Sequence, residues 1–378
     1  RQRHEPQPTP SARHLGKGAK DCVLSTVEFL GVDNHAQPLL HPAIGVKPPS
    51  WRWKARLPLQ MRLQPPKSRV TVAPAPAYDT LMTFLRFLRP ISRLRISPLS
   101  ALPGREGVAI VLIVRNEGRH IAEWARFHHH AGVRHFLVYD NGSTDDTLAQ
   151  IRSALPADAL TVIPWAQRRF RTLRDREIHN QVLAYAHAAL NFGAGFRWFA
   201  FIDVDEFLIP VTAASIPEAL EPLGEQAQVS LPWHMFGRCG HDAPPAGGVL
   251  RNYLYRAADP YGLKHGLNFK CLVDPSRLTE VGVHGFGIDG RQEGVNDAGL
   301  LAAHKDRGKR DFYSRARLQL NHYYTRSDSE LRAKIDLGAI ADVQAAKHAR
   351  RVLRIVDSIE RDTIEDRTAL DYIARSGF

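Results

Sequence analysis

A short apolar run that stops at two aspartates constrains the fold of this chain more than any other feature. Residues 198–210 read Trp-Phe-Ala-Phe-Ile-Asp-Val-Asp-Glu-Phe-Leu-Ile-Pro, and the first five carry no charge. Such a run is typical of a strand buried on both faces, as in a mostly parallel sheet. Asp203, Asp205 and Glu206 then lie at the carboxyl end of the strand, where open α/β sheets bind ligands.

An Asp-x-Asp at this edge of a sheet can hold a hard divalent cation, and that cation can bind a diphosphate. The alternative is a polar loop that caps a helix, since Asp-x-Asp alone is common. The buried strand before Asp203, and a second polar motif upstream at 140–147, favour the metal site.

Strands and helices alternate through the body of the chain. Apolar runs at 108–114, 136–139 and 160–163 predict three more buried strands, and a helix is expected over about 175–190. This alternation predicts an α/β fold with an open, mostly parallel sheet and helices on both faces. After residue 210 the pattern loosens into Gly- and Pro-rich loops, and helices are expected again from Ser329 to the end.

The positive charge is concentrated in the first part of the chain. Residues 1–106 hold 17 of the 51 Lys and Arg, 6 of the 39 Asp and Glu, and 15 of the 25 prolines. This part therefore carries +11 of the total charge of +12. We predict a mostly disordered Pro/Arg-rich arm over 1–106, an α/β domain over 107–328 and a C-terminal helical extension over 329–378. The near-neutral body argues against a nucleic acid partner.

The three cysteines show no Cys-x-x-Cys pair, which argues against a disulfide framework or zinc ribbon and fits a reducing compartment. No apolar run approaches the roughly 20 residues that span a bilayer. We therefore expect a cytoplasmic protein. Residues 81–99 mix apolar and arginine side chains, which indicates either a peripheral membrane contact or an ordinary docking helix broken at Pro90. Because the chain begins at Arg1, we also consider Met82 as the natural start.

Several short motifs occur in an order that resembles a known family. They are Arg115-Asn116-Glu117, Glu123-Trp124, Tyr139-Asp140-Asn141-Gly142-Ser143, Gln181 with Tyr185, Asp203-Val204-Asp205-Glu206-Phe207, Trp233, Phe236-Gly237, Gly240-His241, Lys270, His284 and Asn321-His322-Tyr323-Tyr324. Together they resemble the nucleotide-sugar glycosyltransferases of the family 2-like group with the GT-A fold, closest to the family 92 type and its bacterial relatives. The resemblance covers about residues 107–330.

The resemblance implies a donor site at the carboxyl ends of the strands. Asp140 would accept hydrogen bonds from the uracil or ribose of the nucleotide. Asn116 and Glu117 would line the same crevice, and Lys270 would lie near the diphosphate. Each has a plain structural alternative: an Asx-turn or N-cap for Asp140, helix capping for Asn116 and Glu117, and a surface position for Lys270.

The same resemblance implies that Asp205 binds Mn²⁺ or Mg²⁺, with Asp203 acting through water or the ribose. The cation would neutralise the leaving diphosphate. A histidine as a further ligand would favour Mn²⁺, and His284 and His322 both qualify. We slightly prefer His284, although a lone histidine is more often structural than a ligand.

The acceptor side is implied less sharply. Trp233, Phe236 and His241 resemble the acceptor-facing loop of the family, and simple core packing is their alternative. Members of this group are expected to invert the anomeric configuration, which requires a general base near the acceptor hydroxyl. His241, Asp242 and Glu206 are the candidates, in that order.

These expectations together predict a metal-dependent glycosyltransferase that transfers a sugar from a nucleotide diphosphate to a glycan or lipid-linked acceptor. A sugar nucleotidyltransferase is an alternative, but it needs a Gly-rich, basic phosphate loop where Arg115-Asn116-Glu117-Gly118 stands. A non-catalytic glycan- or nucleotide-binding protein is another, and the presence of both Asp203 and Asp205 argues against it.

Overall fold

The computed structural model describes residues 90–166, 170–172, 176–263, 266–337 and 342–378. These residues belong to one compact unit, Ala73–Phe378. The disorder predicted for residues 1–89, and residues 81–89 of the predicted membrane-contact segment 81–99, lie outside the described residues. None of the helices within the described ranges is long and apolar enough to cross a membrane.

Four parallel strands form one half of the main sheet. They are β2 (Val108–Val114), β3 (Val133–Asp140), β4 (Leu160–Pro164) and β7 (Trp198–Phe201), in the order β7-β2-β3-β4. Val, Ile, Leu and aromatic residues dominate them, as expected for strands whose two faces are both covered. The buried strands that the sequence predicts are confirmed here.

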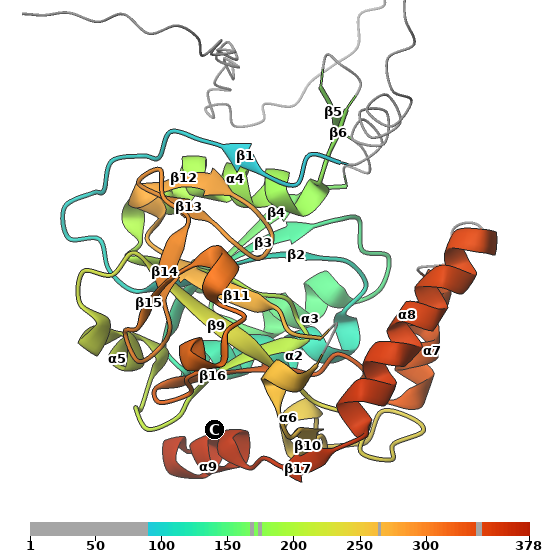
Figure 1. Cartoon of the computed structure of the whole chain (residues 1–378). Coiled ribbons are helices and arrows are strands. Elements are labelled where there is room, and N and C mark those ends of the chain that lie inside the picture. Colours follow the sequence, from blue (N-terminus) through green and yellow to red (C-terminus); the bar gives the residue numbers. More distant parts are fainter. Residues whose placement is uncertain (1–89, 167–169, 173–175, 264–265, 338–341) are drawn as a thin grey trace, which may run out of the picture. The chain divides into compact units, whose positions relative to one another are not determined.

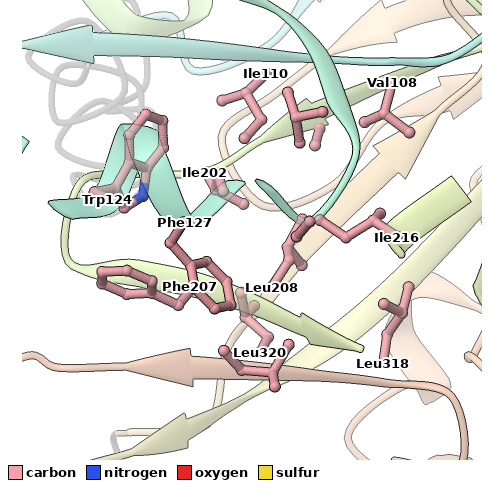
Figure 2. Close-up of a cluster of buried hydrophobic side chains, with 14 of the residues drawn as sticks. Val108, Ile110, Trp124, Phe127, Ile202, Phe207, Leu208, Ile216, Leu318 and Leu320 are labelled. Carbon is pink, nitrogen blue, oxygen red and sulfur yellow. The ribbon is translucent and has the colours of Figure 1, made fainter. Parts of the chain in front are cut away.

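Helices cover both faces of this half of the sheet (Figure 1). Helices α2 (Gly118–His130) and α3 (Thr147–Ala154) pack on one face, and α4 (Asn180–Phe192) packs on the other. Figure 2 shows how Trp124 and Phe127 of α2 lie close to apolar side chains of the sheet in one buried cluster. The predicted α/β architecture is therefore confirmed, and α4 starts a few residues later than expected.

The other half of the sheet is mixed, and the sequence pattern did not reveal it. Strand β11 (Phe269–Val273) runs antiparallel to both β7 and β9 (Gln228–Met235), and β14 (Glu293–Val295) and β15 (Leu301–Ala303) continue the sheet. The prediction of loops beyond residue 210 was incomplete. These strands carry buried polar residues, among them Ser230 and Lys270, so their apolar periodicity is weak.

Two strands after the Asp-x-Asp motif position the candidate site. Strand β8 (Glu206–Pro210) pairs antiparallel with β16 (Leu318–His322), and β16 also pairs parallel with β9. In this register His322 lies opposite Glu206. A residue far along the chain is thereby brought to the carboxyl end of β7.

The C-terminal part is mainly helical, as expected. It contains α7 (Asp328–Leu337), α8 (Asp342–Glu360), β17 (Thr363–Glu365) and α9 (Thr368–Ser376). Strand β17 pairs with β10 (Tyr255–Ala257), and apolar residues near the end of α8 pack against β9 and β10. The predicted domain boundaries at residues 106/107 and 328/329 stay predictions.

The remaining helices and strands are β1 (Leu94–Arg95), β5 (Phe170–Arg171), β6 (Glu177–Ile178), α5 (Ile216–Leu220), α6 (Val249–Asn252), β12 (Leu278–Val281) and β13 (Gly287–Ile288).

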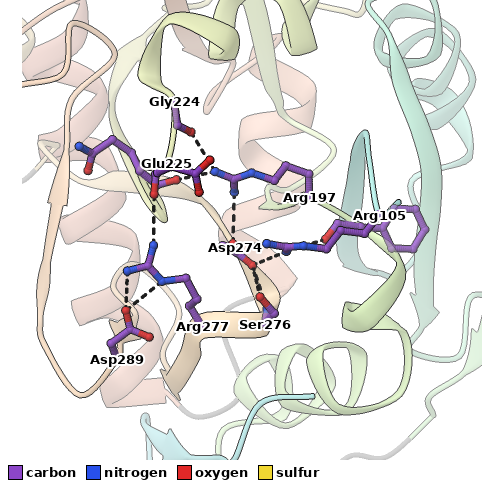
Figure 3. Close-up of polar contacts among 10 residues, drawn as sticks. Arg105, Arg197, Gly224, Glu225, Asp274, Ser276, Arg277 and Asp289 are labelled. Carbon is purple, nitrogen blue, oxygen red and sulfur yellow. Dashed lines mark hydrogen bonds and ion pairs between the residues drawn. The ribbon is translucent and has the colours of Figure 1, made fainter. Parts of the chain in front are cut away.

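A group of charged residues holds the amino edge of β2 and β7 together (Figure 3). Asp274 follows β11, accepts hydrogen bonds from Arg105 at 2.5 and 2.7 Å, and lies 3.4 Å from Arg197. Ser276 donates to the same carboxylate at 2.7 Å. Burial alone would raise the pKa of Asp274, but these donors lower it below its usual value. We call these four residues the amino-edge cluster.

Candidate metal and nucleotide site

A second group of charged residues lies at the opposite, carboxyl edge of β7. The Nε2 atom of His322 is 3.4 Å from Oδ2 of Asp205, and the backbone N–H of Tyr323 donates to the Asp205 carbonyl at 2.8 Å. One ligand atom each from Asp205, Glu206 and His322 lie within 4.8 Å of one another. The pairing of β16 with β8 creates this arrangement, because it sets His322 opposite Glu206.

Lys270 forms ion pairs with both Asp203 and Glu206. Its ammonium is 2.7 Å from Asp203 Oδ2 and 3.3 Å from Glu206 Oε2. The Asp203 backbone N–H and the Trp233 indole N–H also donate to Glu206, at 2.8 and 2.7 Å. Gln181 donates to Asp203 at 3.1 Å. Each oxygen of the buried Glu206 carboxylate therefore has a donor.

We call Asp203, Asp205, Glu206, Lys270 and His322 the carboxyl-edge cluster. Burial raises the pKa of Glu206 to about 8, opposed by the Lys270 ammonium. Burial would also raise the pKa of Asp205, but His322 and Lys334 hold it well below its usual range. Burial lowers the pKa of His322 against the pull of Asp205. A deprotonated aspartate beside a neutral imidazole is the state in which both bind a metal.

The structure brings His322, rather than the preferred His284, to the aspartate. His284 Nδ1 lies 3.1 Å from the Phe269 carbonyl, which fixes this nitrogen as a donor. The His284 ring packs edge-on against Trp233 at a centroid distance of 5.3 Å, and Trp233 packs on His322 at 4.3 Å. Within the described residues, the potential metal-binding group contains His322 and not His284. Our preference for His284 is therefore not supported by the geometry.

The predicted nucleotide-facing residues are held in the loops after β2 and β3. Asn116 has a positive φ of 55°, and its side-chain oxygen accepts from the Thr144 N–H at 2.8 Å. Asp140 accepts from the Ser143 N–H at 3.0 Å, as in the Asx-turn alternative. Glu117 occupies the N-cap of α2 without capping it through its side chain. Their contact with a nucleotide stays a prediction.

The predicted acceptor-facing residues separate in the structure. Phe236 is 1% exposed and packs on Tyr323 at a centroid distance of 4.6 Å, which points to core packing. Trp233 contacts Glu206 and both histidines, so it supports the carboxyl-edge cluster. His241 and Asp242 instead line a cavity of about 570 Å³, together with Arg238, Asp328 and Glu360. No member of the carboxyl-edge cluster lines this cavity.

Sequence reasoning missed two cations that lie near Asp205. Lys334 of α7 is 3.5 Å from Asp205 Oδ2, and Arg326, between β16 and α7, donates to Glu117 at 2.9 Å. Neither has a sequence signal of its own, because both belong to a segment whose position depends on the β16 register. Lys270, which the sequence did single out, is 1% exposed and already held by two carboxylates. Its predicted role at the diphosphate stays a prediction.

The donor set suits a hard divalent cation. Two carboxylates and one imidazole nitrogen at short mutual distance match the ligands of Mn²⁺. The partly exposed Asp203, at 38%, and Asp205, at 20%, leave an approach from solvent. The site thus combines a group of possible metal ligands with the loops that follow two neighbouring parallel strands, the arrangement in which open sheets bind nucleotides.

Comparison with known proteins agrees with this geometry. Residues 112–298 match the model of glycosyltransferase family 92. A glycosyltransferase family 92 protein of Ricinus communis is 30% identical over 226 residues, which cover 56% of this chain and 38% of that protein. One from Oryza sativa subsp. japonica is 26% identical over 179 residues, 46% of this chain and 27% of that protein. The chain thus spans well under half of the length of these relatives.

Two solved structures also resemble the chain, with lower similarity. One is glucosyl-3-phosphoglycerate synthase from Mycobacterium tuberculosis with Mn²⁺, UDP-glucose and phosphoglyceric acid, at 22% identity, a TM-score of 0.26, and coverage of 46% of this chain and 58% of that one. The other is a mannosyltransferase from Pyrobaculum calidifontis with GDP-Man and Mn²⁺, at 20% identity, a TM-score of 0.26, and coverage of 40% and 42%. On the family model and the curated relatives, residues 112–298 of this chain are similar to glycosyltransferase family 92.

Proposed function

We propose that this protein is a metal-dependent glycosyltransferase that transfers a sugar from a nucleotide diphosphate to an acceptor hydroxyl. The observation that supports it best is the convergence of Asp205, Glu206 and His322 within 4.8 Å at the carboxyl end of β7. The match of residues 112–298 to glycosyltransferase family 92 supports the same reaction class. The loops after β2 and β3 would hold the nucleotide beside this group.

In this proposal Asp205 and His322 would hold a divalent cation, Mn²⁺ or Mg²⁺, while Asp203 would face the ribose or a water. When bound, the cation would neutralise charge on the diphosphate as it leaves. Lys270 and Trp233 keep the Glu206 carboxylate fixed, which in turn holds the backbone of Asp203 through a 2.8 Å hydrogen bond. These contacts keep the motif in one conformation before the substrate binds.

In the transfer, the bond between the anomeric carbon and the phosphate oxygen breaks, and its electron pair stays on the nucleotide diphosphate. The acceptor oxygen forms the new bond to that carbon, and its proton passes to a base. We propose an inverting reaction and a glycan or lipid-linked acceptor. His241, Asp242 and Glu206 remain the candidate bases, and the contacts of Glu206 with its donors would have to loosen before it accepts a proton.

The cavity around His241 is the structural argument for placing the acceptor there. It is open, and Tyr255, which is 48% exposed, offers a ring to the apolar face of a sugar. A cytoplasmic location, with a peripheral membrane contact through residues 81–99, also stays part of the proposal.

A donor screen tests the proposal. The full chain is incubated with UDP- and GDP-sugars and Mn²⁺, and the release of nucleoside diphosphate is followed with and without sugar or glycan acceptors. We expect release from at least one donor, lost on chelation and restored by added Mn²⁺. Release that is unaffected by excess chelator, or no binding of any nucleotide diphosphate, would contradict the assignment.

A further inference from the structure

Two cations from the segment that follows β16 lie near Asp205 and are not used by the proposed reaction. We propose that Arg326 and Lys334 bind the diphosphate of the donor, so that α7 forms one wall of the donor site. This inference rests on the proposed function. It gives the C-terminal helical segment a direct part in substrate binding. Arg326 and Lys334 lie outside both the sequence motifs and the matched residues 112–298.

Lys334 faces the carboxyl-edge cluster and makes one long ion pair with it, to Asp205. Its Nζ is 3.0 Å from the Tyr324 carbonyl and 3.8 Å from the centre of the Tyr324 ring, which holds the side chain in place. The contact with Asp205 Oδ2 is long, at 3.5 Å, and the side chain is 39% exposed. By contrast, Lys270 is 2.7 Å from Asp203 and 1% exposed. An ammonium has three N–H donors, so Lys334 keeps capacity for an anion.

Arg326 presents unused donors. One guanidinium nitrogen donates to Glu117 at 2.9 Å, but Nε and Nη2 are buried and have no hydrogen-bond partner among the described residues. Buried unpaired N–H groups are costly, and a neighbouring pair of them matches the oxygens of a phosphate. Arg326 also has a positive φ of 49°, so its backbone is held in a conformation that only a few non-glycine residues adopt. The surrounding contacts must therefore maintain this orientation.

The position of α7 is fixed by contacts at its start. Glu330 lies 2.5 Å from His120 of α2 and accepts from the Ser327 hydroxyl and backbone N–H at 2.5 and 3.0 Å. Asp328 pairs with Arg238 at 2.8 Å. Because α7 is anchored here, Lys334, which follows Glu330 by one turn, stays over the carboxyl edge of the sheet.

The charge of the site also suits a metal bound together with a diphosphate. The acidic groups of Glu117, Asp203, Asp205 and Glu206 face three cations, from Lys270, Arg326 and Lys334. A divalent cation and the two negative charges of a nucleotide-sugar diphosphate cancel each other. Binding the pair therefore leaves the net charge of the site unchanged, whereas binding the cation alone brings it into repulsion with Lys334.

Lys334 should therefore weaken the binding of Mn²⁺ alone and strengthen the binding of a nucleoside diphosphate in the presence of Mn²⁺. Lys334→Met removes the charge and keeps the length of the side chain. Mn²⁺ binding is measured by titration, first alone and then with saturating UDP or GDP, and UDP and GDP binding is measured with saturating Mn²⁺. We expect the variant to bind Mn²⁺ alone a few-fold more tightly, and to bind the nucleoside diphosphate about tenfold more weakly.

Matched controls separate this effect from a general disturbance of α7. Arg332→Met is a control in the same helix. The Arg332 side chain is exposed, and among the described contacts it pairs only with Asp328. This variant should change neither Mn²⁺ binding nor nucleoside diphosphate binding. Uridine and guanosine, which lack phosphates, should bind Lys334→Met as they bind the wild type. Arg326→Lys keeps the charge beside Glu117 but loses the fork of donors, and should weaken diphosphate binding about fivefold.

Each other outcome overturns the inference. Weaker binding of both Mn²⁺ alone and the diphosphate would mean that Lys334 only maintains the fold of the site. Tighter binding of both would mean that it only screens Asp205. Unchanged diphosphate affinity in Lys334→Met, with a wild type that binds UDP or GDP, would refute this inference alone. A wild type that binds no nucleoside diphosphate would refute the proposed function and this inference together.

Discussion

The two ends of strand β7 each carry a cluster of charged residues, and the two clusters differ in how well their acidic groups are paired. In the amino-edge cluster, Asp274 is 3% exposed, and Arg105 and Arg197 satisfy it together with Ser276 (Figure 3). In the carboxyl-edge cluster, Asp203 and Asp205 stay partly exposed, and the contacts of Asp205 with its basic neighbours are 3.4 and 3.5 Å long. One cluster closes on itself, and the other keeps capacity for a ligand.

The difference shows that buried charge alone does not identify a functional site. Both clusters shift the pKa of an aspartate downward against the effect of burial. What separates the two aspartates is the geometry of their partners. Asp274 has a short bidentate contact with Arg105, whereas Asp205 has only long single contacts with His322 and Lys334. We therefore expect substitutions at the carboxyl edge to affect activity and those at the amino edge to affect stability.

The largest expected effect is on turnover, in Asp205→Asn. Metal neutralisation of a leaving diphosphate is worth several kcal/mol, so turnover should fall on the order of a thousandfold. The free energy of unfolding should fall by only about 1 kcal/mol or less, because the contacts of Asp205 with His322 and Lys334 are long, at 3.4 and 3.5 Å, and its side chain is 20% exposed. Donor hydrolysis and urea denaturation measure the two quantities. Full turnover in Asp205→Asn would show that the difference between the two clusters does not reflect catalysis.

The reverse is expected for Asp274→Asn. It leaves two guanidinium groups without their common partner, which should lower the free energy of unfolding by about 2–3 kcal/mol. This is below the usual cost for a fully buried pair, because Arg105 and Arg197 are 18% and 22% exposed. Nucleoside diphosphate affinity of the folded protein should stay as in the wild type. Lost affinity at full stability would show that the amino edge also takes part in function.

The two histidines beside Trp233 sharpen the comparison within the carboxyl edge. His322→Ala should weaken Mn²⁺ affinity about tenfold or more, as expected when a ligand nitrogen is lost. His284→Ala removes a ring that packs on the same indole, and should change Mn²⁺ affinity much less. Titration with Mn²⁺ compares them directly. A larger loss in His284→Ala would favour His284 as the ligand after all.

The smallest expected effect concerns the buried core behind the carboxyl edge. His128 donates through Nδ1 to the Trp124 carbonyl and accepts the Leu208 N–H at Nε2, so it must be neutral when folded. Burial lowers its pKa from 6.5 to about 3. The unfolded state takes up a proton near pH 6.5 and the folded state does not. Stability is therefore lost as the pH falls below 6.5, by about 0.8 kcal/mol at pH 6 from this group.

Urea denaturation at several pH values measures this loss. His128→Asn keeps a donor for the Trp124 carbonyl and removes the titrating group, so its stability should depend less on pH between 7 and 5. The amino-edge cluster should not contribute in this range, because the pKa of Asp274 is lowered below its ordinary acidic value. An equal pH dependence in the variant would mean that other groups cause the acid loss.

Much of the parallel half of the fold was predictable from the sequence. The four parallel strands β7, β2, β3 and β4 contain apolar runs, so local patterns are enough to identify them. The aspartates at the end of β7 follow from the same pattern, because a buried parallel strand that stops at carboxylates places them at the ligand-binding edge of the sheet. The loops with Asn116 and Asp140 were located by the same reasoning.

The mixed half was not predictable in this way. Strands β9, β11 and β16 contain buried polar residues such as Ser230, Lys270 and Asn321, which disrupt the apolar alternation that indicates a strand. Such residues are stable inside because partners from other strands satisfy them, and a single segment does not show its partners. The sequence could thus name Lys270 but not place it between Asp203 and Glu206.

The sequence by itself determined the α/β class, the edge of the sheet that carries the carboxylates, and the family through its ordered motifs. Only the tertiary structure decided which histidine meets Asp205 and which cations surround it. The reason is register: His322 lies opposite Glu206 because β16 pairs with β8 across more than a hundred residues of chain. A shift of one residue would turn His322 to the other face of the sheet. Pairings of this kind depend on the packing of the whole domain, which no local pattern encodes.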